Sequence, residues 1–342
     1  MDTPVPLPQS KSTELMAELP TVLEEKYFFG SPLGLGKYGR VMKVGLDKKD
    51  YKALDYEYFA LKSCRDARFE GTMTSLDYQE IKALRALQNE ENIVKIIELV
   101  KNKKDEFKGI ILEMCKANLA RILHNIEIQY DVRHIKCMVK QFMTGVAAIH
   151  RRGMMHRDLM PSNILISCDG VIKICDFVTT VVVADHQHDL DPNIGNMWYR
   201  SPEVLLGSTK YDEKIDLWSS GLICVEFFTR RGLFKGYTFP IDQMEKISEL
   251  CGFPSKEIWP GADTLPNYDE FHAKLAHHNE NTLEDYLATT TMMPTSTEFI
   301  FKLLQLVPKD RMPAEEALQH PFLAAGYAPA ESLREILQQF RF

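Results

Sequence analysis

The sequence predicts an α+β fold in which a small β-rich lobe precedes a larger α-helical lobe. From residue 27 to about residue 100 the pattern is strand-like and punctuated by glycines, with one helical stretch, LDYQEIKALRALQ. Beyond about residue 117, apolar residues recur every three to four positions, as they do on the buried face of a helix. This helical pattern is found in HIKCMVKQFMTGVAAIHRRG, DLWSSGLICVEFFT, IDQMEKISELCG, STEFIFKLLQLV and PAEEALQHPFL.

The two lobes form one predicted domain over residues 23–323. The small lobe spans about residues 23–114 and the large lobe about residues 116–323. Residues 1–22 contain four prolines and several small polar residues, which indicates a flexible leader, and residues 324–342 form a C-terminal tail. Ligands commonly bind in the cleft between two lobes, so we expect the functional site there.

The composition is that of an ordinary globular protein. Of the 342 residues, 45% are hydrophobic and 26% are charged, which excludes wholesale disorder. The net charge is −7, from 41 Lys and Arg against 48 Asp and Glu. This acidic balance argues against a nucleic-acid partner and against binding to an anionic membrane surface.

The seven cysteines are scattered, and no two of them form a C-x-x-C pair. This spacing favours neither a disulfide framework nor a zinc cluster, so we expect a reducing compartment. No apolar run approaches the roughly 20 residues of a membrane span, and the start, MDTPVPLPQSKSTE, lacks the charged-then-apolar order of a signal peptide. We therefore expect a cytoplasmic or nuclear protein without a membrane span.

A glycine-rich segment lies near the start of the predicted small lobe. It consists of Gly34, Leu35, Gly36, Lys37, Tyr38, Gly39, Arg40 and Val41. The G-x-G-x-x-G pattern alone is weak, since glycines at this density also form ordinary hairpins. A dinucleotide-binding fold needs a helix after the glycines, whereas the strand-like VMKVGL follows here.

Two charged residues further along have both a surface and a functional interpretation. Lys62 ends the strand-like FALK, where a lone lysine commonly protects a sheet edge. Glu80 lies 18 residues later in a helical stretch, where a solvated face is the ordinary interpretation. Together, a strand Lys and a helix Glu also match the ion pair that orients Lys toward nucleotide phosphates.

Five further motifs give these observations a common explanation. They are HRDLMPSN (156–163), DF (176–177), WYRSPE (198–203), DLWSSG (216–221) and DR (310–311). In this order and spacing they resemble the motifs of protein kinases, over about residues 28–322. The resemblance implies the bilobal protein kinase fold, with ATP and Mg²⁺ as cofactors.

Within the protein kinases, the chain most resembles the cyclin-dependent kinases. This resemblance rests on WYRSPEVLLG, on GLFKGYTFPIDQMEKISELCGFPSKEIWPG and on the 27 residues from Asp176 to Glu203. The stretches EIKALRALQNEENIVKI, CKANLARIL and LPNYDEF resemble the cell cycle-related kinase subgroup, which is associated with cilia. The narrower resemblance implies the cilium as a further location.

The kinase resemblance assigns roles to individual residues. Asp158 receives the proton of the substrate hydroxyl, and Lys62, held by Glu80, clamps the nucleotide phosphates. Asn163 and Asp176 hold magnesium. The residues implied in ATP binding are Gly34, Leu35, Gly36, Lys37, Tyr38, Gly39, Val41, Ala60, Lys62, Leu112, Glu113, Cys115 and Leu165. The aliphatic members of this set would equally suit a hydrophobic core.

The resemblance also implies that Cys175 faces the nucleotide, although a free cysteine is usually a small buried hydrophobe. Glu203 and Arg311 are expected to form a buried ion pair that braces the large lobe. This second role is structural, and neither residue is expected to touch the substrate.

Three residues depart from the kinase pattern in the catalytic motifs. Val178 replaces the Gly after Asp176-Phe177, and a β-branched residue narrows the backbone conformations of the segment. Met160 replaces a Lys that contacts the moving phosphate, a loss of about 2–4 kcal/mol of transition-state stabilisation by analogy with other electrostatic deletions. Asn196 replaces a Thr that bridges the catalytic Asp and this Lys, and we expect its amide to substitute in part.

A fourth departure concerns regulation. In cyclin-dependent kinases three arginines hold a phosphorylated Thr, and their positions here read Gln79, Arg157 and Val181, with Asp191 at the acceptor position. Only one of the three arginines remains, and the acceptor position has no hydroxyl. The chain therefore lacks most of the cations that would bind a phosphate of nearly −2 charge. The TSLDYQE stretch also matches the cyclin-contacting helix poorly, which argues against a cyclin or other activating partner.

Gly195 and Arg200 concern the substrate. In proline-directed kinases the residue at the position of Gly195 adopts an unusual backbone conformation and turns its carbonyl toward the arginine. A substrate amide then has no acceptor, so proline, which lacks an N–H, is favoured. The resemblance implies protein substrates with Ser or Thr before Pro, while a loop glycine and a packing arginine are the ordinary alternative.

Three functions remain open on the sequence alone. The residues that touch metal, proton or phosphate are all present, which favours an active but attenuated serine/threonine kinase. The three departures in the catalytic motifs favour a nucleotide-binding pseudokinase that acts as a scaffold or allosteric regulator. A kinase-shaped interaction module without nucleotide is the third, and an intact glycine-rich segment argues against it.

Overall fold

The computed structural model describes residues 19–36, 39–46, 58–64, 72–185, 189–236, 238–291 and 293–339. Most of the predicted leader, and Lys37 and Tyr38, lie outside these residues. The described chain divides into two compact units. The small unit comprises its residues up to Lys116 together with Cys175–Thr180, and the large unit comprises residues 117–174 and 181–339.

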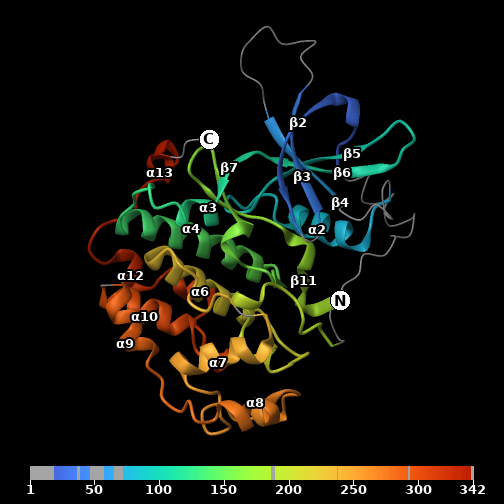
Figure 1. Ribbon diagram of the computed structural model, residues 1–342. Coiled ribbons are helices and arrows are strands. Elements are labelled where there is room, and N and C mark those ends of the chain that lie inside the picture. Colours follow the sequence, from blue (N-terminus) through green and yellow to red (C-terminus); the bar gives the residue numbers. More distant parts are fainter. Residues whose placement is uncertain are drawn as a thin grey trace. The chain divides into compact units, whose positions relative to one another are not determined.

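The small unit is built on a six-stranded sheet in the order β1-β5-β6-β4-β3-β2 (Figure 1). The β1–β5 pair is parallel and the other neighbours are antiparallel. Its core cluster consists of Tyr27, Val44, Leu61, Val100 and Ile111. The strands are β1 (Thr21–Leu23), β2 (Tyr27–Leu35), β3 (Gly39–Leu46), β4 (Tyr58–Cys64), β5 (Ile96–Lys101) and β6 (Phe107–Glu113).

Helix α2 (Ser75–Ala86) is the helix expected around Glu80. Thr74 and Asp77 form a capping box at its start, in which the Asp77 N–H donates to Thr74 Oγ1 at 3.2 Å and the Thr74 N–H donates to Asp77 Oδ2 at 2.8 Å. Ile81 and Leu84 are fully buried beside Glu80. The apolar face of α2 therefore carries Glu80 into the interior of the small unit.

The large unit is mainly helical. Helix α6 (Lys214–Thr229) packs against α4 (Val132–Arg151) and α10 (Pro294–Leu303) (Figure 1). All side chains from Ile215 to Phe227 are buried, which is typical of a helix at the centre of a core. Among the described helices, none combines the length and the apolarity needed to cross a membrane.

The remaining helices of the large unit are shorter. Helix α7 packs against α5 and α8, and α9 packs against α6 and α10. They are α3 (Leu119–Leu123), α5 (Pro202–Leu205), α7 (Pro240–Cys251), α8 (Tyr268–Leu275), α9 (Leu283–Thr291), α11 (Ala314–Ala317), α12 (Pro321–Ala324) and α13 (Arg334–Gln339).

Short strands and turns hold the loops of the large unit that carry the sequence motifs. Strand β9 (Ile164–Ser167) pairs with β10 (Ile172–Ile174), and β8 (Met154–Met155) pairs with β11 (Val181–Val182). Strand β7 (Cys115–Asn118), within which the chain passes from one unit to the other, lies beside β9. Among the described residues, η1 (Glu24–Lys26) and η5 (Phe177–Thr179) are 3-10 turns of the small unit. Those of the large unit are η4 (Pro161–Asn163), η6 (Val183–Asp185), η7 (Met197–Tyr199), η8 (Ala262–Thr264) and η9 (Pro308–Asp310).

One predicted helix is wrong. The stretch PAEEALQHPFL forms two short helices, α11 and α12. The break falls at His320-Pro321, because Pro321 has no N–H to donate and disfavours a helical backbone at the residue before it. His320 accordingly has an extended backbone. The apolar spacing across the break reflects two separate contacts with the core.

The ion pair expected between Glu203 and Arg311 is confirmed. Arg311 Nη1 lies 2.6 Å from Glu203 Oε1, and Nη2 lies 2.7 Å from Oε2, in a bidentate arrangement. Both residues are buried, and Arg311 also donates to the main-chain oxygen of Lys214 at 2.9 Å. Removing one partner of such a buried pair costs about 3–5 kcal/mol, so this pair braces the large unit.

The segment predicted as a C-terminal tail packs onto the large unit over its described length. Lys136 Nζ, fully buried on α4, donates to the carbonyl oxygen of Tyr327 at 2.9 Å. The Leu333 N–H donates to the Gly170 carbonyl at 3.0 Å, and the Leu333 and Ile336 side chains are fully buried. The tail therefore contributes to the core of this unit.

Candidate active site

Three charged side chains meet in the small unit. Lys62 Nζ on β4 lies 2.6 Å from Glu80 Oε1 on α2 and 2.7 Å from Asp176 Oδ1. Asp176 directly precedes η5, and η5 packs against α2. The structure thus brings together two residues that the sequence places on a strand and a helix, and adds Asp176 from 114 residues beyond Lys62.

The three charged side chains are buried to different degrees. The Lys62 and Glu80 side chains are 12% and 4% exposed, while that of Asp176 is 29% exposed. Burial alone lowers the pKa of Lys62, but the charges of Asp176 and Glu80 outweigh it and hold the pKa well above its ordinary value. Lys62 is therefore a permanent cation, and the more exposed carboxylate of Asp176 is an oxygen ligand suited to Mg²⁺.

The residues predicted around adenine in the small unit lie on neighbouring strands. Val41 on β3 pairs with Lys62 on β4, and Ala60 on β4 pairs with Leu112 on β6. Gly34 on β2 lies opposite Val41. The sheet register therefore places these aliphatic residues next to the strand that carries the lysine.

The other predicted nucleotide residues divide between the units. A Cβ at Gly39 would lie 2.9 Å from the Ser63 carbonyl oxygen, so the close approach of β3 to β4 requires glycine there. Glu113 and Cys115 stand at the end of β6 and the start of β7, whereas Leu165 lies on β9 in the large unit.

Burial raises the pKa of the Cys175 thiol well above its ordinary value. Cys175 directly precedes Asp176 and belongs to the small unit. A protonated, half-buried thiol is a weak nucleophile, so we assign Cys175 no chemical role.

In the large unit, both carboxylate oxygens of Asp158 accept hydrogen bonds. The Asn196 N–H donates to Oδ1 at 2.9 Å, and Asn163 Nδ2 donates to Oδ2 at 3.2 Å and to the Asp158 carbonyl at 2.9 Å. Because the amide nitrogen of Asn163 is engaged, its amide oxygen is the atom suited to approach a cation. The predicted base and one predicted metal ligand are thus fixed relative to each other.

The loop that carries Asp158 is fixed by Asp216, a residue to which the sequence analysis gave no role. Asp216 is buried on α6 and accepts the His156 N–H at 2.8 Å and the Arg157 N–H at 2.9 Å. His150 Nε2 lies 3.1 Å from the same carboxylate. Burial alone raises the pKa of Asp216, but the hydrogen bond and charge of His150 help to hold it below its ordinary value. The apolar run DLWSSGLICVEFF contains two acids, Asp216 and Glu226, and an acid in such a run was the available signal.

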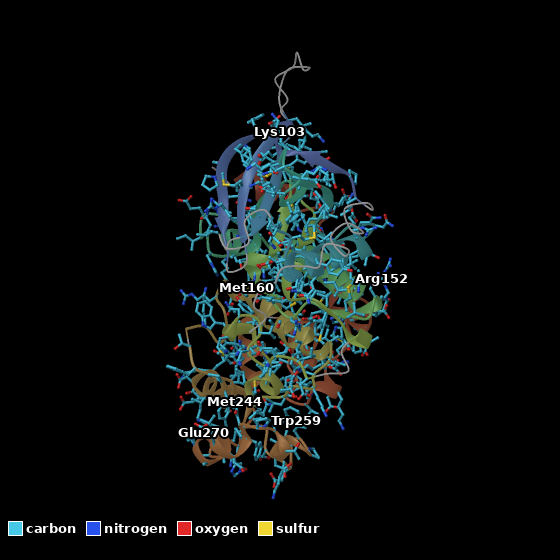
Figure 2. The ribbon with its side chains drawn as sticks, turned by 90° about the vertical axis from the view of Figure 1, so that its right-hand side faces the viewer. Lys103, Arg152, Met160, Met244, Trp259 and Glu270 are labelled. Carbon is cyan, nitrogen blue, oxygen red and sulfur yellow. The ribbon has the colours of Figure 1, made fainter. Side chains whose placement is uncertain are left out.

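The expected role of the Asn196 amide is wrong. Asn196 Oδ1 accepts the Trp198 N–H at 2.9 Å and caps η7, while the backbone N–H of Asn196 holds Asp158. Asn is a favoured capping residue because its short side chain reaches the amide two residues on. Met160, labelled in Figure 2, precedes η4 and brings no charge to this loop.

Gly195 has the backbone geometry expected of it. Its φ is +71°, and a Cβ there would overlap the carbonyl oxygen of Arg157. Arg200 Nη2 donates to the Gly195 carbonyl at 3.2 Å, and Arg200 Nε donates to the Ile194 carbonyl at 3.1 Å. The Gly195 carbonyl is thus occupied by Arg200.

The activation segment, residues 176–203, has an acid at the position of the expected phosphate. Partial burial alone would raise the pKa of Asp191, but hydrogen bonds, first that of the Asn193 amide at 2.8 Å, hold it below its ordinary value. Val181, at the position of a missing arginine, is 4% exposed in an apolar cluster. Thr179 and Thr180 are 3% and 5% exposed, so neither offers its hydroxyl to a modifying enzyme.

Comparison with known families agrees with this arrangement of motifs. The protein kinase domain family matches residues 27–323. The chain belongs to the protein kinase family. The α+β fold predicted from the sequence is therefore confirmed as the protein kinase fold.

Relatives of this kinase come from the cyclin-dependent branch and its neighbours. Cyclin-dependent kinase 9 of Homo sapiens is 30% identical over 316 residues, which cover 90% of this chain and 82% of the relative. Extracellular signal-regulated kinase 2 of Dictyostelium discoideum is 31% identical over 317 residues, covering 90% and 81%. The resemblance to cyclin-dependent kinases is confirmed, and the narrower cell cycle-related subgroup stays a prediction.

Solved structures give the same fold. A chain of the CAK complex from Chaetomium thermophilum, bound to ATP-gamma-S, superposes with a TM-score of 0.76 at 26% identity and covers 96% of this kinase and 98% of that chain. A chain of the yeast RNA Pol II CTD kinase CTDK-1 complex has a TM-score of 0.77 at 24% identity, with 88% and 94% covered, and supports the fold alone.

We expect nucleotide binding to depend on both Lys62 and Asp176. Replacing Lys62 by Met removes the cation that is predicted to bind the phosphates, and Asp176→Asn removes the charge that is predicted to bind the metal. Thermal-shift titration should show a rise in Tm with Mg-ATP for the wild type, and a much smaller rise for either variant. Lys104→Met, at an exposed lysine of the same unit, is the control and should behave as wild type. If the wild type shows no shift at millimolar Mg-ATP, the chain binds no nucleotide.

Met160 is expected to limit the chemical step. Met160→Lys should raise the rate of phosphoryl transfer about tenfold or more, without changing Mg-ATP affinity, because the added cation acts on charge that develops in the transition state. Single-turnover assays measure this rate. Met160→Leu is the neutral control and should leave it unchanged, and an equal rate for Met160→Lys would contradict the argument.

Proposed function

We propose that this chain is an ATP- and Mg²⁺-dependent serine/threonine kinase of the cyclin-dependent type, with attenuated activity. The observation that carries the proposal is the fixed carboxylate of Asp158, which accepts one N–H on each oxygen from Asn163 and Asn196. A carboxylate oriented in this way suits a catalytic base, because its position relative to the substrate is set before binding.

The metal and phosphate ligands follow from the donor chemistry of each unit. We assign Lys62 to the nucleotide phosphates, and the carboxylate of Asp176 and the amide oxygen of Asn163 to magnesium. When bound, Mg-ATP supplies the phosphoryl group and the metal neutralises its charge. One similar solved structure contains an ATP analogue, which supports nucleotide binding here.

Asp158 acts on the substrate hydroxyl in this proposal. Its carboxylate accepts the hydroxyl proton as the substrate oxygen forms a bond to the γ-phosphorus and the bond to the β-phosphate oxygen breaks, which releases ADP. The N–H donors on Asp158 hold the carboxylate while the proton arrives. Because Met160 supplies no cation to the transferred group, we expect this step to be slow.

The occupied carbonyl of Gly195 supports proline after the acceptor residue. Arg200 takes the hydrogen bond that a substrate amide would otherwise donate to Gly195. A substrate residue with an N–H would leave that donor unpaired at a cost of about 1–3 kcal/mol, whereas proline has no donor to satisfy. We therefore propose Ser-Pro and Thr-Pro sites in proteins as substrates.

A nucleotide-binding pseudokinase is the second candidate. It is favoured by Met160, and by Val178, which lies buried inside η5 where the family has Gly. Val178 is compatible with the 3-10 turn η5. Its β-branched side chain disfavours other backbone conformations that a Gly would allow at this position. Single-turnover transfer to a Ser-Pro protein substrate, with Asp158→Asn as the inactive control, separates the candidates. Equal rates for wild type and control would establish the pseudokinase.

Partners and location are proposed on narrower grounds. Both similar solved structures belong to complexes, but the sequence around α2 matches the cyclin-contacting helix poorly, so we propose that no cyclin is needed. The cysteines whose side chains are described are free thiols, in keeping with a cytoplasmic or nuclear location. A place in the cilium rests on the narrower resemblance alone.

Activity is expected to be independent of phosphorylation in the activation segment. Asp191 has no hydroxyl, and Thr179 and Thr180 are buried. Phosphatase treatment should leave the rate of transfer to a protein substrate unchanged. A cyclin-dependent kinase that carries its segment phosphate serves as the control and should lose activity. A large loss in this chain would show that another hydroxyl has taken over the role.

Proline selectivity is expected to depend on Arg200. The wild type should prefer a Ser-Pro peptide over the matched Ser-Ala peptide by about tenfold or more in kcat/KM, the effect of one unpaired donor. Arg200→Ala should reduce this ratio by freeing the Gly195 carbonyl. Arg152→Ala, at an exposed arginine labelled in Figure 2, is the control. Equal use of both peptides by the wild type would contradict the proposed substrate class.

A further inference from the structure

The C-terminal segment, residues 324–339, binds the turn of the β9–β10 hairpin. The Leu333 N–H donates to the Gly170 carbonyl at 3.0 Å, and Arg334 Nε donates to the Asp169 carbonyl at 3.2 Å. Arg334 Nη2 also pairs with the Asp169 carboxylate, but both side chains are mostly exposed, so this ion pair contributes little. The bonds to the two carbonyls and the buried Leu333 side chain therefore hold the turn.

The turn approaches the segment so closely that only glycine fits at position 170. Gly170 is buried and has a φ of +79°, and its N–H closes the turn on the Ser167 carbonyl at 3.0 Å. A Cβ at this position would lie 2.5 Å from the Arg334 nitrogen and 2.8 Å from the Leu333 nitrogen. Any side chain there would displace the start of α13.

The segment is itself anchored on the large unit before and after this contact. The Ala330 N–H donates to the Arg133 carbonyl at 3.0 Å. At the other end of α13, Gln339 Nε2 donates to the Gln129 carbonyl at 3.0 Å, and the Gln129 N–H donates to Gln339 Oε1 at 2.7 Å. Because it is bound on both sides of Leu333, the segment is a fixed support for the turn.

The opposite end of the hairpin carries a predicted magnesium ligand. Asn163 directly precedes β9, and its side chain is bonded to Asp158. The two strands between Asn163 and the turn are joined in register and present four fully buried isoleucines, Ile164, Ile166, Ile172 and Ile174. A closely packed interior transmits displacements, so a shift of the turn is expected to reach Asn163.

We propose that Leu333 and Arg334 are positioning residues, through which the C-terminal segment holds the β9–β10 turn and thereby fixes Asn163 at the other end of the hairpin. The proposal rests on the proposed function for the role of Asn163 toward magnesium. Neither positioning residue touches nucleotide, metal or substrate in this role. The segment predicted as a tail thus supports the active site.

Leu333→Ala tests the hold on the hairpin, because it removes the buried side chain and keeps the main-chain N–H. In hydrogen–deuterium exchange on the full chain without nucleotide, we expect the amides of residues 164–172 to exchange about tenfold faster, while those of α6 stay unchanged. Gln338→Ala, at an exposed position of α13, is the control and should change neither. Unchanged hairpin exchange in Leu333→Ala would overturn the proposal.

Two comparisons separate this hold from a loss of overall stability. Arg334→Ala removes only a donor at the surface, so we expect the fold to persist and the amides of residues 169–172 to exchange about threefold faster. Unchanged exchange in this variant would overturn the role of Arg334. If Leu333→Ala accelerates exchange in α6 as much as in the hairpin, the segment supports the whole unit, which would overturn the positioning role.

Magnesium gives a functional readout. At a fixed ATP concentration, the MgCl₂ concentration that produces half of the rise in Tm should be about fivefold higher for Leu333→Ala than for the wild type or Gln338→Ala, because a loosened ligand binds metal more weakly. In an Asn163→Ala background, adding Leu333→Ala should have no further effect, since the ligand through which it acts is gone. An equal MgCl₂ requirement in Leu333→Ala, or an undiminished effect in the Asn163→Ala background, would overturn the positioning role.

The failure of this proposal is distinguishable from the failure of the proposed function. If the wild type shows no rise in Tm with Mg-ATP, the assignment of nucleotide and magnesium fails. Faster hairpin exchange in Leu333→Ala would still support the hold of the segment on the hairpin in that case.

Discussion

The buried carboxylate of Asp216 is the interaction on which the large unit's chemistry depends. An unpaired charge buried in the first turn of an otherwise apolar helix would cost several kcal/mol, so Asp216 requires donors, and the N–H groups of His156 and Arg157 supply them. Meeting this requirement fixes the backbone before Asp158, with Arg157 in the left-handed region. The approach of Gly195 to Arg157, and the hydrogen bond from Asn196 to Asp158, are possible only because this loop is held in place.

Around this fixed loop, apolar contacts stand where charges are expected. Val181 and Met160 stand where the resemblance to cyclin-dependent kinases places cations, and Val181 lies in the cluster that packs Leu190. An ordered segment needs favourable contacts of some kind, and the burial of Val181 and Leu190 in this cluster supplies part of them. The substitutions therefore weaken electrostatic help to the reaction more than they weaken the fold. A slow kinase that needs no segment phosphate is the consequence we propose.

In the small unit the three charges around Lys62 are kept. Lys62 lies between two carboxylates, and the pair with Glu80 depends on α2, whose start is fixed by the capping box of Thr74. The third charge, Asp176, has a left-handed backbone with φ of 67°, and the 3-10 turn after it accommodates Val178 without strain. Val178, one of the three departures in the catalytic motifs, is thus compatible with the observed conformation, because glycine is needed only for conformations that this turn does not adopt.

The sequence by itself determined the fold class and most of the long helices, and it singled out Asp158, Asn163, Lys62, Glu80 and Asp176 as the candidate site, because periodicity and motif spacing are local properties of the chain. It could not determine which partner each polar atom would choose. The side chain of Asn196 could have bound either Asp158 or the start of η7. In the tertiary structure it accepts the Trp198 N–H at the start of η7, and the backbone N–H of Asn196 donates to Asp158. The sequence places Asp216 in the DLWSSG motif but does not show its partners, since these hydrogen bonds exist only when α6 and the catalytic loop meet. Burial determines these hydrogen-bond partners, because a polar group removed from water must bind the donor or acceptor that folding brings within reach.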